Sequence, residues 1–228
     1  MMDIRSGGAS PATAPDAGKT PALPERWAGQ VLAGGRSTRF GGEKAVALLR
    51  RKPLMGWCAE ALGGLCPTVA INARSGSGAA ALARELGFEI VADDPAHPAG
   101  PLAGVAAGLK WAGAQGFDGL VTLPCDTPLV GGDELTRLIA ALGNSPAAYA
   151  VANGRAQGLC AAWRTSLAAA LNARLADGDH PAVHRWLDEI GAAPVRFADD
   201  ARFRNINTRE DLAAVDDIRP SRARQVDF

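Results

Sequence analysis

From Trp27 onward, short apolar segments alternate along the chain with longer segments in which apolar residues recur at helical spacing. The short segments end at polar or glycine-rich positions, as strands do, and the longer ones have the length of helices. The predicted strands of this region are Gly29–Ala33, which continues the apolar run from Trp27, Thr68–Asn72, Phe88–Ala92 and Leu120–Pro124. The predicted helices are Leu54–Leu62, Ser77–Leu86, Leu102–Gln115 and Glu134–Leu142.

This alternation of strands and helices predicts an α/β fold. Strands joined through helices run parallel, and short, almost wholly apolar strands are typical of a sheet covered on both faces. Right-handed crossovers then place helices on both sides of the sheet. We therefore predict a Rossmann-like three-layer α/β/α sandwich around a mostly parallel sheet.

After Asn144 the pattern changes. Two apolar segments flank Asn153-Gly154, a dipeptide that favours the tight turn of a β-hairpin, so they predict a ribbon or an extension of the sheet. These segments are Ala147–Ala152 and Leu159–Trp163. The remaining predicted elements are helices at Ser166–Ala176 and Ala182–Ile190, a strand at Pro194–Phe197, and a final helix that begins near Thr208 with Thr208 and Asp211 in a capping box.

The chain is expected to fold as one domain, residues 26–218, with a loose tail at each end. Residues 1–25 are rich in Ala, Pro, Gly, Ser and Thr without periodicity, and we interpret them as disordered, with a second tail at 219–228. Residues 1–24 lack the apolar core of an export signal, and no apolar run reaches membrane-spanning length. We therefore expect no membrane association.

Charge and cysteine content narrow the choice of function. Lys and Arg number 24, as do Asp and Glu, so the net charge is zero and a nucleic-acid partner is not indicated. The four cysteines show no Cys-x-x-Cys spacing, which speaks against a zinc site or a disulfide framework. We expect reduced thiols and a cytoplasmic protein.

The most informative segment is Leu32-Ala-Gly-Gly-Arg-Ser-Thr-Arg-Phe-Gly-Gly-Glu-Lys44, directly after the first predicted strand. Glycines such as Gly34 and Gly35 bring backbone N–H groups against a ligand, and Arg39 and Lys44 add positive charge, a combination that favours a phosphate chain. The segment matches neither the Walker loop nor the Rossmann fingerprint. A flexible glycine-rich surface loop is the alternative.

Polar side chains stand at the carboxyl end of every strand predicted before Asn144. Asn72 ends the second strand, Asp93 and Asp94 follow the third, and Asp126 follows the fourth. Ligands of open α/β sheets bind at this edge, so the side chains should converge on the glycine-rich loop. Asp126 is the best candidate for a Mg²⁺ ligand, because this ion prefers one or two carboxylates together with substrate phosphates. Each of these residues could instead cap a turn.

Asn207 is a second candidate for the metal site. It belongs to Asn205-Ile-Asn207, in which alternate side chains of an extended segment point to one face, and amide oxygens can bind Mg²⁺ or its water. The alternative is a turn and cap for the last helix.

Taken together, these motifs resemble the molybdenum cofactor guanylyltransferases, a family with the nucleotide-diphospho-sugar transferase or glycosyltransferase-A-like fold. The resemblance covers about residues 28–216. The motifs that carry it are Leu32-Ala-Gly-Gly35, Arg39, Gly41-Gly42, Lys44, Lys52-Pro-Leu54, Asn72-Ala73, Asp93, Gly100-Pro-Leu-Ala-Gly104, Pro124-Cys-Asp-Thr-Pro128 and Asn205-x-Asn-Thr208.

The resemblance implies transfer of GMP from GTP to the terminal phosphate of molybdopterin, with release of pyrophosphate. It also implies Mg²⁺ on Asp126 and a possible transient contact with molybdoenzymes or cofactor-delivery proteins. The residues that it assigns to GTP are Leu32, Ala33, Gly34, Lys44, Asn72, Asp93 and Asp126, and we add Gly35 from the same loop.

Three departures and two rival functions stay open. Glu43 stands where the family commonly has Asp, Gln157-Gly158 differs from the usual pair in the region facing the pterin, and Gly178–Pro181 replaces the arginine-rich turn of some members. The acceptor is therefore less well specified than the nucleotidyl transfer. The rival functions are a cytidylyltransferase, or another nucleotidyltransferase with a small phosphate acceptor, and a non-catalytic nucleotide-binding protein.

Overall fold

The computed structural model describes residues 25–35, 38–178, 180–198 and 201–216. The predicted tails, apart from Glu25, lie outside the described residues, as do the end of the predicted domain and Arg36 and Ser37 of the glycine-rich segment.

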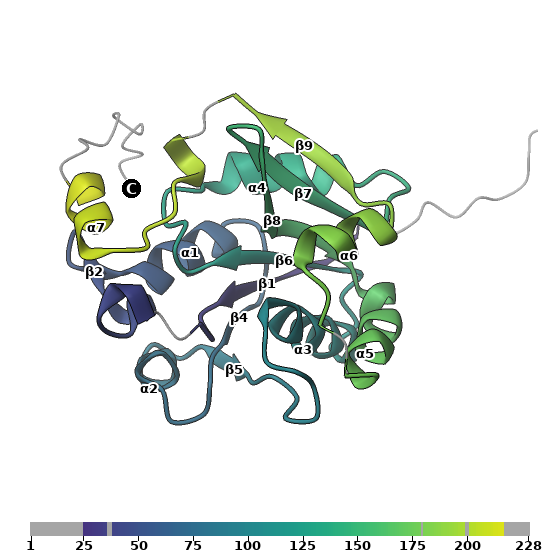
Figure 1. Cartoon of the computed structure of the whole chain (residues 1–228), viewed down its shortest axis with the longest axis horizontal. Helices are drawn as coiled ribbons and strands as arrows, with labels where there is room; N and C mark the ends of the chain where they lie inside the picture. Colours follow the sequence, from purple (N-terminus) through teal and green to yellow (C-terminus); the bar gives the residue numbers. More distant parts are fainter. Residues whose placement is uncertain (1–24, 36–37, 179, 199–200, 217–228) are drawn as a thin grey trace, which may run out of the picture.

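A mixed sheet runs through the middle of the molecule with helices on both sides (Figure 1). Within the described residues it has seven strands in the order β5-β4-β1-β6-β8-β7-β9. The strand bounds are β1 Trp27–Leu32, β4 Val69–Asn72, β5 Glu89–Val91, β6 Gly119–Pro124, β7 Ala147–Ala152, β8 Arg155–Arg164 and β9 Ala193–Phe197. The predicted α/β sandwich with a mostly parallel sheet is confirmed.

The sheet has a parallel half and a mixed half. In the first, β5, β4, β1 and β6 are parallel neighbours, with Val31 of β1 beside Ile71 of β4 and Leu123 of β6. Among the described strands of this sheet, β8 alone runs antiparallel to its neighbours, and it separates β6 from β7. Asn153 and Gly154 take φ values of 52° and 68° in the β7–β8 turn, as the two central residues of a type I′ hairpin require.

Two layers of helices bury the two faces of the sheet. One core gathers buried side chains of α1, α2 and α4, and the other gathers those of α3, α5 and α6. The bounds are α1 Leu54–Gly63, α2 Gly78–Glu85, α3 Pro101–Ala114, α4 Gly132–Ala140, α5 Ala168–Ala176 and α6 Val183–Glu189. Each predicted helix is present, with ends that differ by at most two residues, in part because caps such as Ser77 lie just outside the helix.

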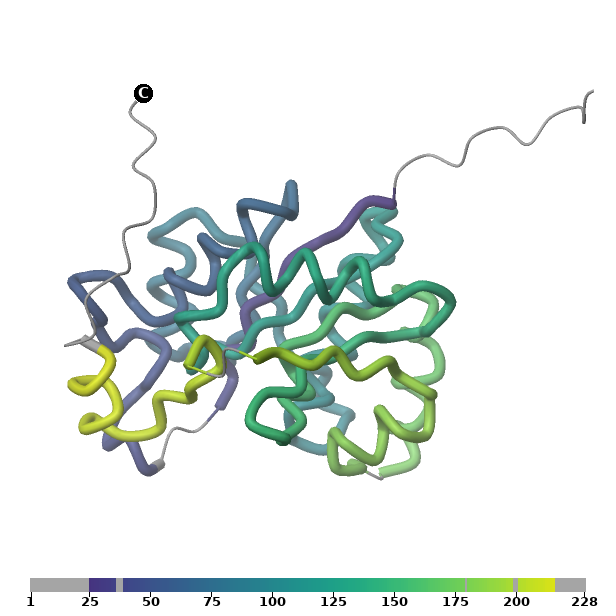
Figure 2. The backbone as a smooth tube through the Cα atoms, turned by 90° about the horizontal axis from the view of Figure 1, so that it is seen from above, coloured from purple at the N-terminus to yellow at the C-terminus, as the bar shows by residue number. Residues whose placement is uncertain are grey.

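A third, smaller core joins the C-terminal helix to the region after β1. It contains Phe40, Leu49, Leu54, Ile206 and Val215. The helix α7 (Arg209–Asp216, yellow) therefore lies beside the loop that follows β1 (purple) in Figure 2. Two short elements here were not predicted: the hairpin strands β2 (Leu48–Leu49) and β3 (Lys52–Pro53).

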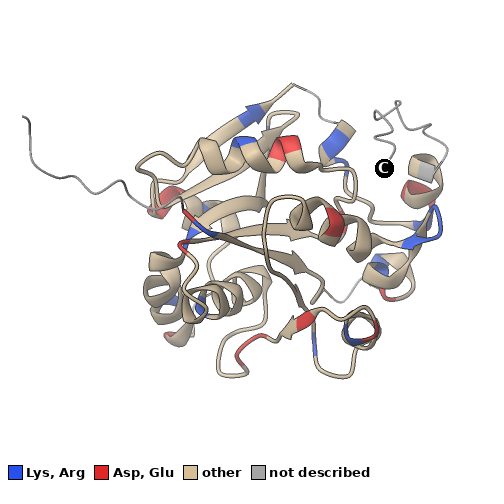
Figure 3. Cartoon of the chain, turned by 180° about the vertical axis from the view of Figure 1, so that it is seen from behind, with Lys and Arg blue, Asp and Glu red and all other residues tan. Residues whose placement is uncertain are grey.

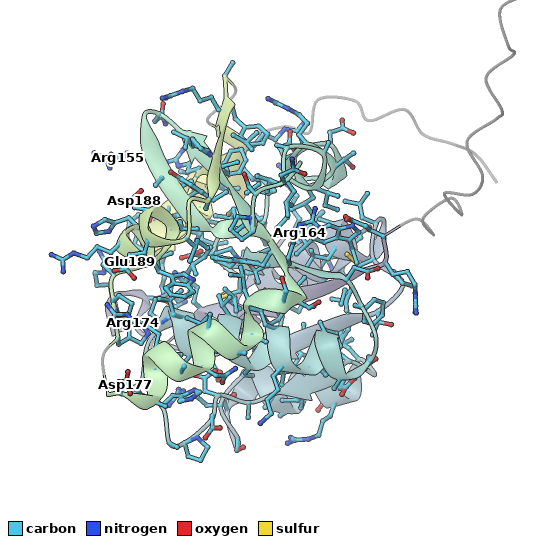
Figure 4. All side chains as sticks on the ribbon, turned by 90° about the vertical axis from the view of Figure 1, so that its right-hand side faces the viewer. Arg155, Arg164, Arg174, Asp177, Asp188 and Glu189 are labelled. Carbon is cyan, nitrogen blue, oxygen red and sulfur yellow. The ribbon has the colours of Figure 1, made fainter. Side chains whose placement is uncertain are left out.

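Positively and negatively charged residues are interspersed along the helices and strands (Figure 3). On the face shown in Figure 4, Arg174 of α5 lies next to Glu189 of α6, with 3.5 Å between the guanidinium and carboxylate. Within the described residues, no helix combines the length and apolarity needed to cross a membrane.

Candidate active site

A cleft of about 580 Å³ opens at the carboxyl ends of the parallel strands. All ten residues that the sequence assigned to a site line it: Leu32, Ala33, Gly34, Gly35, Arg39, Lys44, Asn72, Asp93, Asp126 and Asn207. The segment that opens α3 contributes Gly100, Pro101 and Gly104. Asn72, Asp93 and Asp126 from the predicted strand ends therefore lie at one cleft with the glycine-rich loop, whereas Asp94 is not among the residues that line it.

The start of the glycine-rich loop is fixed by its neighbours in the sheet. The backbone N–H of Ala33 donates to the carbonyl of Asn72 over 2.9 Å, and the N–H of Cys125 donates to the carbonyl of Leu32 over 3.1 Å. The chain thus leaves β1 at a defined point between β4 and β6. Further along, Arg39 lies on the three-residue 3₁₀ turn Thr38–Phe40, where it is exposed and faces the cleft.

Lys44 joins three distant parts of the sequence. Its ammonium donates to the carboxylate of Asp126 at 2.8 Å and to the amide oxygen of Asn207 at 3.3 Å. The N–H of Ile206 donates to the Asp126 carbonyl over 2.8 Å, which fixes the Asn207 segment against the end of β6. The side chains of Lys44 and Asp126 are 12% and 21% exposed, so the charge pair is partly screened from water yet open to the cleft.

The oxygens around Lys44 are also suitable ligands for a divalent cation. Oxygens of Asp126 and Asn207 already surround one positively charged group, and both are of the kind that Mg²⁺ takes. Across the described ranges, no group of three or more His, Cys, Asp or Glu side chains could hold a metal ion. A Mg²⁺ ion at Asp126 and Asn207 would therefore need oxygens from phosphates and water, which is its usual coordination in nucleotide sites.

Asn72 organises the opposite wall of the cleft. It is 4% exposed, and its amide N–H₂ donates to the carbonyl of Val91 at 3.0 Å and to the carboxylate of Asp93 at 2.7 Å. Its oxygen lies against α3, where a Cβ on Gly104 would come within 2.6 Å of it. Only glycine leaves room for this packing. Asp94 takes the turn-capping role instead, because its carboxylate accepts from Ala96 N–H at 3.0 Å.

Comparison with known proteins identifies the family. A family model described as the MobA-like NTP transferase domain matches residues 29–192 of the chain. The chain belongs to this family. A molybdenum cofactor guanylyltransferase from Cereibacter sphaeroides is 43% identical over 191 residues, which cover 83% of this chain and 95% of the relative. Another protein of that name from Acidiphilium cryptum is 38% identical over 189 residues, covering 82% of this chain and 92% of the relative.

Solved structures show the same fold. Molybdopterin-guanine dinucleotide biosynthesis protein A from Archaeoglobus fulgidus superposes with a TM-score of 0.68 at 23% identity, over 83% of this chain and 96% of that one. A 4-diphosphocytidyl-2C-methyl-D-erythritol synthase from Anaerococcus prevotii superposes with a TM-score of 0.64 at 11% identity, covering 84% and 97% of the two chains. The fold is thus that of nucleotidyltransferases.

The cysteine thiols are buried, and burial raises their pKa. Burial, together with the negative charge of Asp126, raises the pKa of Cys125, which lines the cleft, to about 12. Burial also raises the pKa of Cys160 to about 12. Both thiols are therefore protonated near neutral pH. All four cysteines are free and buried, as expected for reduced thiols.

The sequence reasoning missed Arg74. It lines the cleft two residues beyond the end of β4 and places a third cation beside Arg39 and Lys44 among the lining residues. A signal was present, since Arg74 follows Asn72-Ala73 directly. A search of strand ends that continued two residues further would have included it.

Proposed function

We propose that the chain is a Mg²⁺-dependent guanylyltransferase that moves GMP from GTP to the terminal phosphate of molybdopterin. The observation that carries this proposal is the meeting of Lys44, Asp126 and Asn207 at the mouth of the glycine-rich loop. Family membership and the names of the relatives support the choice of nucleotide and acceptor. A cationic cradle beside a carboxylate is the arrangement that a triphosphate and its metal need.

The reaction is a displacement at phosphorus. An oxygen of the molybdopterin phosphate forms a bond to the α-phosphorus of GTP, the bond from that phosphorus to the bridging oxygen breaks, and pyrophosphate leaves with the electron pair. Such transfers depend mainly on positioning and on neutralising charge. The attacking group belongs to the substrate, so the protonated thiol of Cys125 has no covalent role.

Each wall of the cleft has a part in this scheme. Arg39, Lys44 and Arg74 would attract the negative charge of the triphosphate, while the amides of Gly34 and Gly35 would contact its oxygens. Leu32 and Ala33, which line the cleft, would pack against the nucleoside. Asp93, held by Asn72, would accept hydrogen bonds from it.

Asp126 and Asn207 are the residues that would hold Mg²⁺. When bound, the ion supplies positive charge that polarises the phosphate oxygens. Lys44 would then move its ammonium from Asp126 towards the phosphate chain. The reaction would take place in the cytoplasm, which suits the four free thiols, and the product would be passed on in transient contact with molybdoenzymes or cofactor-delivery proteins.

The test is incubation with labelled GTP, Mg²⁺ and molybdopterin, followed by identification of the products. We expect pyrophosphate and the guanine dinucleotide form of the cofactor, with GTP preferred over CTP, ATP and UTP in competition. Selective use of CTP would replace this proposal by a cytidylyltransferase. Binding of GTP without pyrophosphate release under any acceptor condition would favour a non-catalytic nucleotide-binding protein.

A further inference from the structure

Glu43, the residue before Lys44, makes an unusual contact for a loop side chain. Its two carboxylate oxygens accept from the backbone N–H groups of Gly78 at 2.6 Å and Ala79 at 3.0 Å, at the start of α2. These N–H groups have no partner within the helix, and the helix dipole favours a negative charge at this end. Glu43 therefore fastens the end of the glycine-rich segment to an element that is 35 residues away in sequence.

The packing around Gly78 is shaped for this contact. A Cβ on Gly78 would come within 2.7 Å of the Glu43 carboxylate oxygen, so any larger residue would displace the carboxylate. Ser77 caps the same helix independently, since its hydroxyl oxygen accepts from Ala80 N–H at 3.1 Å. The N–H groups at the start of α2 are thus capped by two residues. Ser77, next to the helix, caps Ala80, and Glu43, distant in sequence, caps Gly78 and Ala79.

Glu43 directly precedes Lys44, whose ammonium faces the cleft. Lys44 begins the 3₁₀ turn Lys44–Val46, whose carbonyl at Lys44 accepts from Ala47 N–H at 3.0 Å. Because the backbone of Lys44 is continuous with that of Glu43, fixing the carboxylate fixes the base of the lysine side chain. The same contact ties the turn that carries Arg74, between β4 and α2, to the glycine-rich segment.

We propose that Glu43 is a positioning residue that holds Lys44 in its place in the cleft by clamping the loop to the N–H groups of Gly78 and Ala79. The inference rests on the proposed function for the ligand of Lys44, whereas the clamp itself can be tested without any ligand. Ser77 is the matched control, because it caps the same helix without contacting the loop.

The first experiment measures amide hydrogen exchange in the full chain. Glu43→Ala should speed exchange at Gly78, Ala79 and Ala47, whereas Ser77→Ala should speed it at Ala80 and leave Ala47 unchanged. Unchanged protection of Ala47 in a folded Glu43→Ala variant would overturn the proposal. This outcome does not depend on whether the chain binds GTP.

The second experiment measures the dissociation constant for GTP and the thermal midpoint of unfolding. Glu43→Ala should weaken GTP binding about tenfold or more, since small misplacements of a binding group are costly. In a Lys44→Ala background the same change should have little further effect, because the two residues act through one contact. Equal losses in both backgrounds would overturn the positioning role, and failure of the original chain to bind GTP would instead reject the proposed function.

Gly78→Ala guards against a simple loss of folding. Alanine favours helix more than glycine, which offsets the loss of the Glu43 cap, so this variant should stay folded and melt close to the original chain. It should nevertheless weaken GTP binding, because the new Cβ displaces the Glu43 carboxylate. Full GTP affinity in Gly78→Ala, with Glu43 displaced, would contradict the proposal.

Discussion

The two halves of the sheet differ in what they bring to the cleft. The four parallel strands β5, β4, β1 and β6 all end at one edge, and each end delivers polar groups: the glycine-rich loop, Asn72, Asp93 and Asp126. From the mixed half, β8 presents Leu159 from its middle, since it runs in the opposite direction. The parallel strands place their polar end groups at one edge of the sheet, whereas the antiparallel strand β8 contributes an apolar side chain to one side of the cleft.

Asn207 belongs to a C-terminal segment that returns to the cleft. After β9 the chain returns to the parallel half, where Ile206 N–H bonds to the Asp126 carbonyl and brings Asn207 to Lys44. The candidate metal site thus combines the end of β6 with a segment about 80 residues later. We therefore expect the nucleotide to bind at the parallel half and the acceptor to bind on the side of the cleft where β8 contributes Leu159.

The sharpest test of this division is Asp126→Ala. Because it removes the carboxylate of the candidate metal site, we expect pyrophosphate release to fall by about 10²–10³-fold or more. The fold should persist, since the Asp126 side chain is 21% exposed and lies at the end of its strand. Initial rates of pyrophosphate release and a thermal melt of the same sample measure both effects.

The matched control is Asp133→Ala, which removes an exposed carboxylate from the first turn of α4. Its turnover should equal that of the original chain. Unchanged turnover in Asp126→Ala would show that the end of β6 does not hold the metal.

A smaller effect is expected from Leu159→Ala, which shortens the wall provided by β8. Loss of an apolar contact in a binding pocket typically changes selectivity roughly tenfold. We expect the KM for molybdopterin to rise by about this factor while the KM for GTP stays the same, in steady-state kinetics with each substrate varied in turn. Leu86→Ala, at a half-exposed position outside the cleft, serves as control. A rise in the KM for GTP alone would reverse the assignment of the two halves.

The parallel half could be predicted from sequence because its signals are local. Apolar runs mark its strands, and the rule that ligands bind at the carboxyl ends of strands selects Asn72, Asp93 and Asp126 without any three-dimensional knowledge. The capping pair Thr208 and Asp211 is likewise visible in the sequence and present in the structure.

The mixed half could be predicted only in part. Asn153-Gly154 indicates a hairpin, but nothing local states which of its strands pairs with β6, and that choice depends on long-range packing. The predicted strand Leu159–Trp163 proved to be the second half of the longer β8, because exposed Arg155 and Ala156 also pair in the ladder. The two-residue strands β2 and β3 are too short for any periodicity to show.

The smallest effect concerns the segment that returns to the site. The carboxylate of Asp211 accepts from the backbone N–H groups of Asn207 and Thr208, both at 2.9 Å, and these bonds lower the pKa of Asp211, that from Asn207 most. Asp211→Asn keeps an oxygen that can accept both bonds but removes its negative charge, so it should reduce the free energy of unfolding at pH 7 by roughly 0.5–1 kcal/mol, as the weakening of partly exposed charge-assisted bonds does. Chemical denaturation at a series of pH values measures it.

The pH dependence follows from the direction of the shift. A carboxyl whose pKa is lower in the folded than in the unfolded state stabilises the fold above the unfolded value of about 3.9, and this contribution is lost as the pH falls through the folded pKa. The difference between the original chain and Asp211→Asn should therefore be constant at neutral pH and shrink below about pH 4. Glu210→Gln removes one charge from the same turn without touching the bonds to Asn207 and Thr208, so its effect should be smaller. Equal effects of the two variants at neutral pH would mean that helix charge, rather than the bonds to Asn207 and Thr208, stabilises this segment.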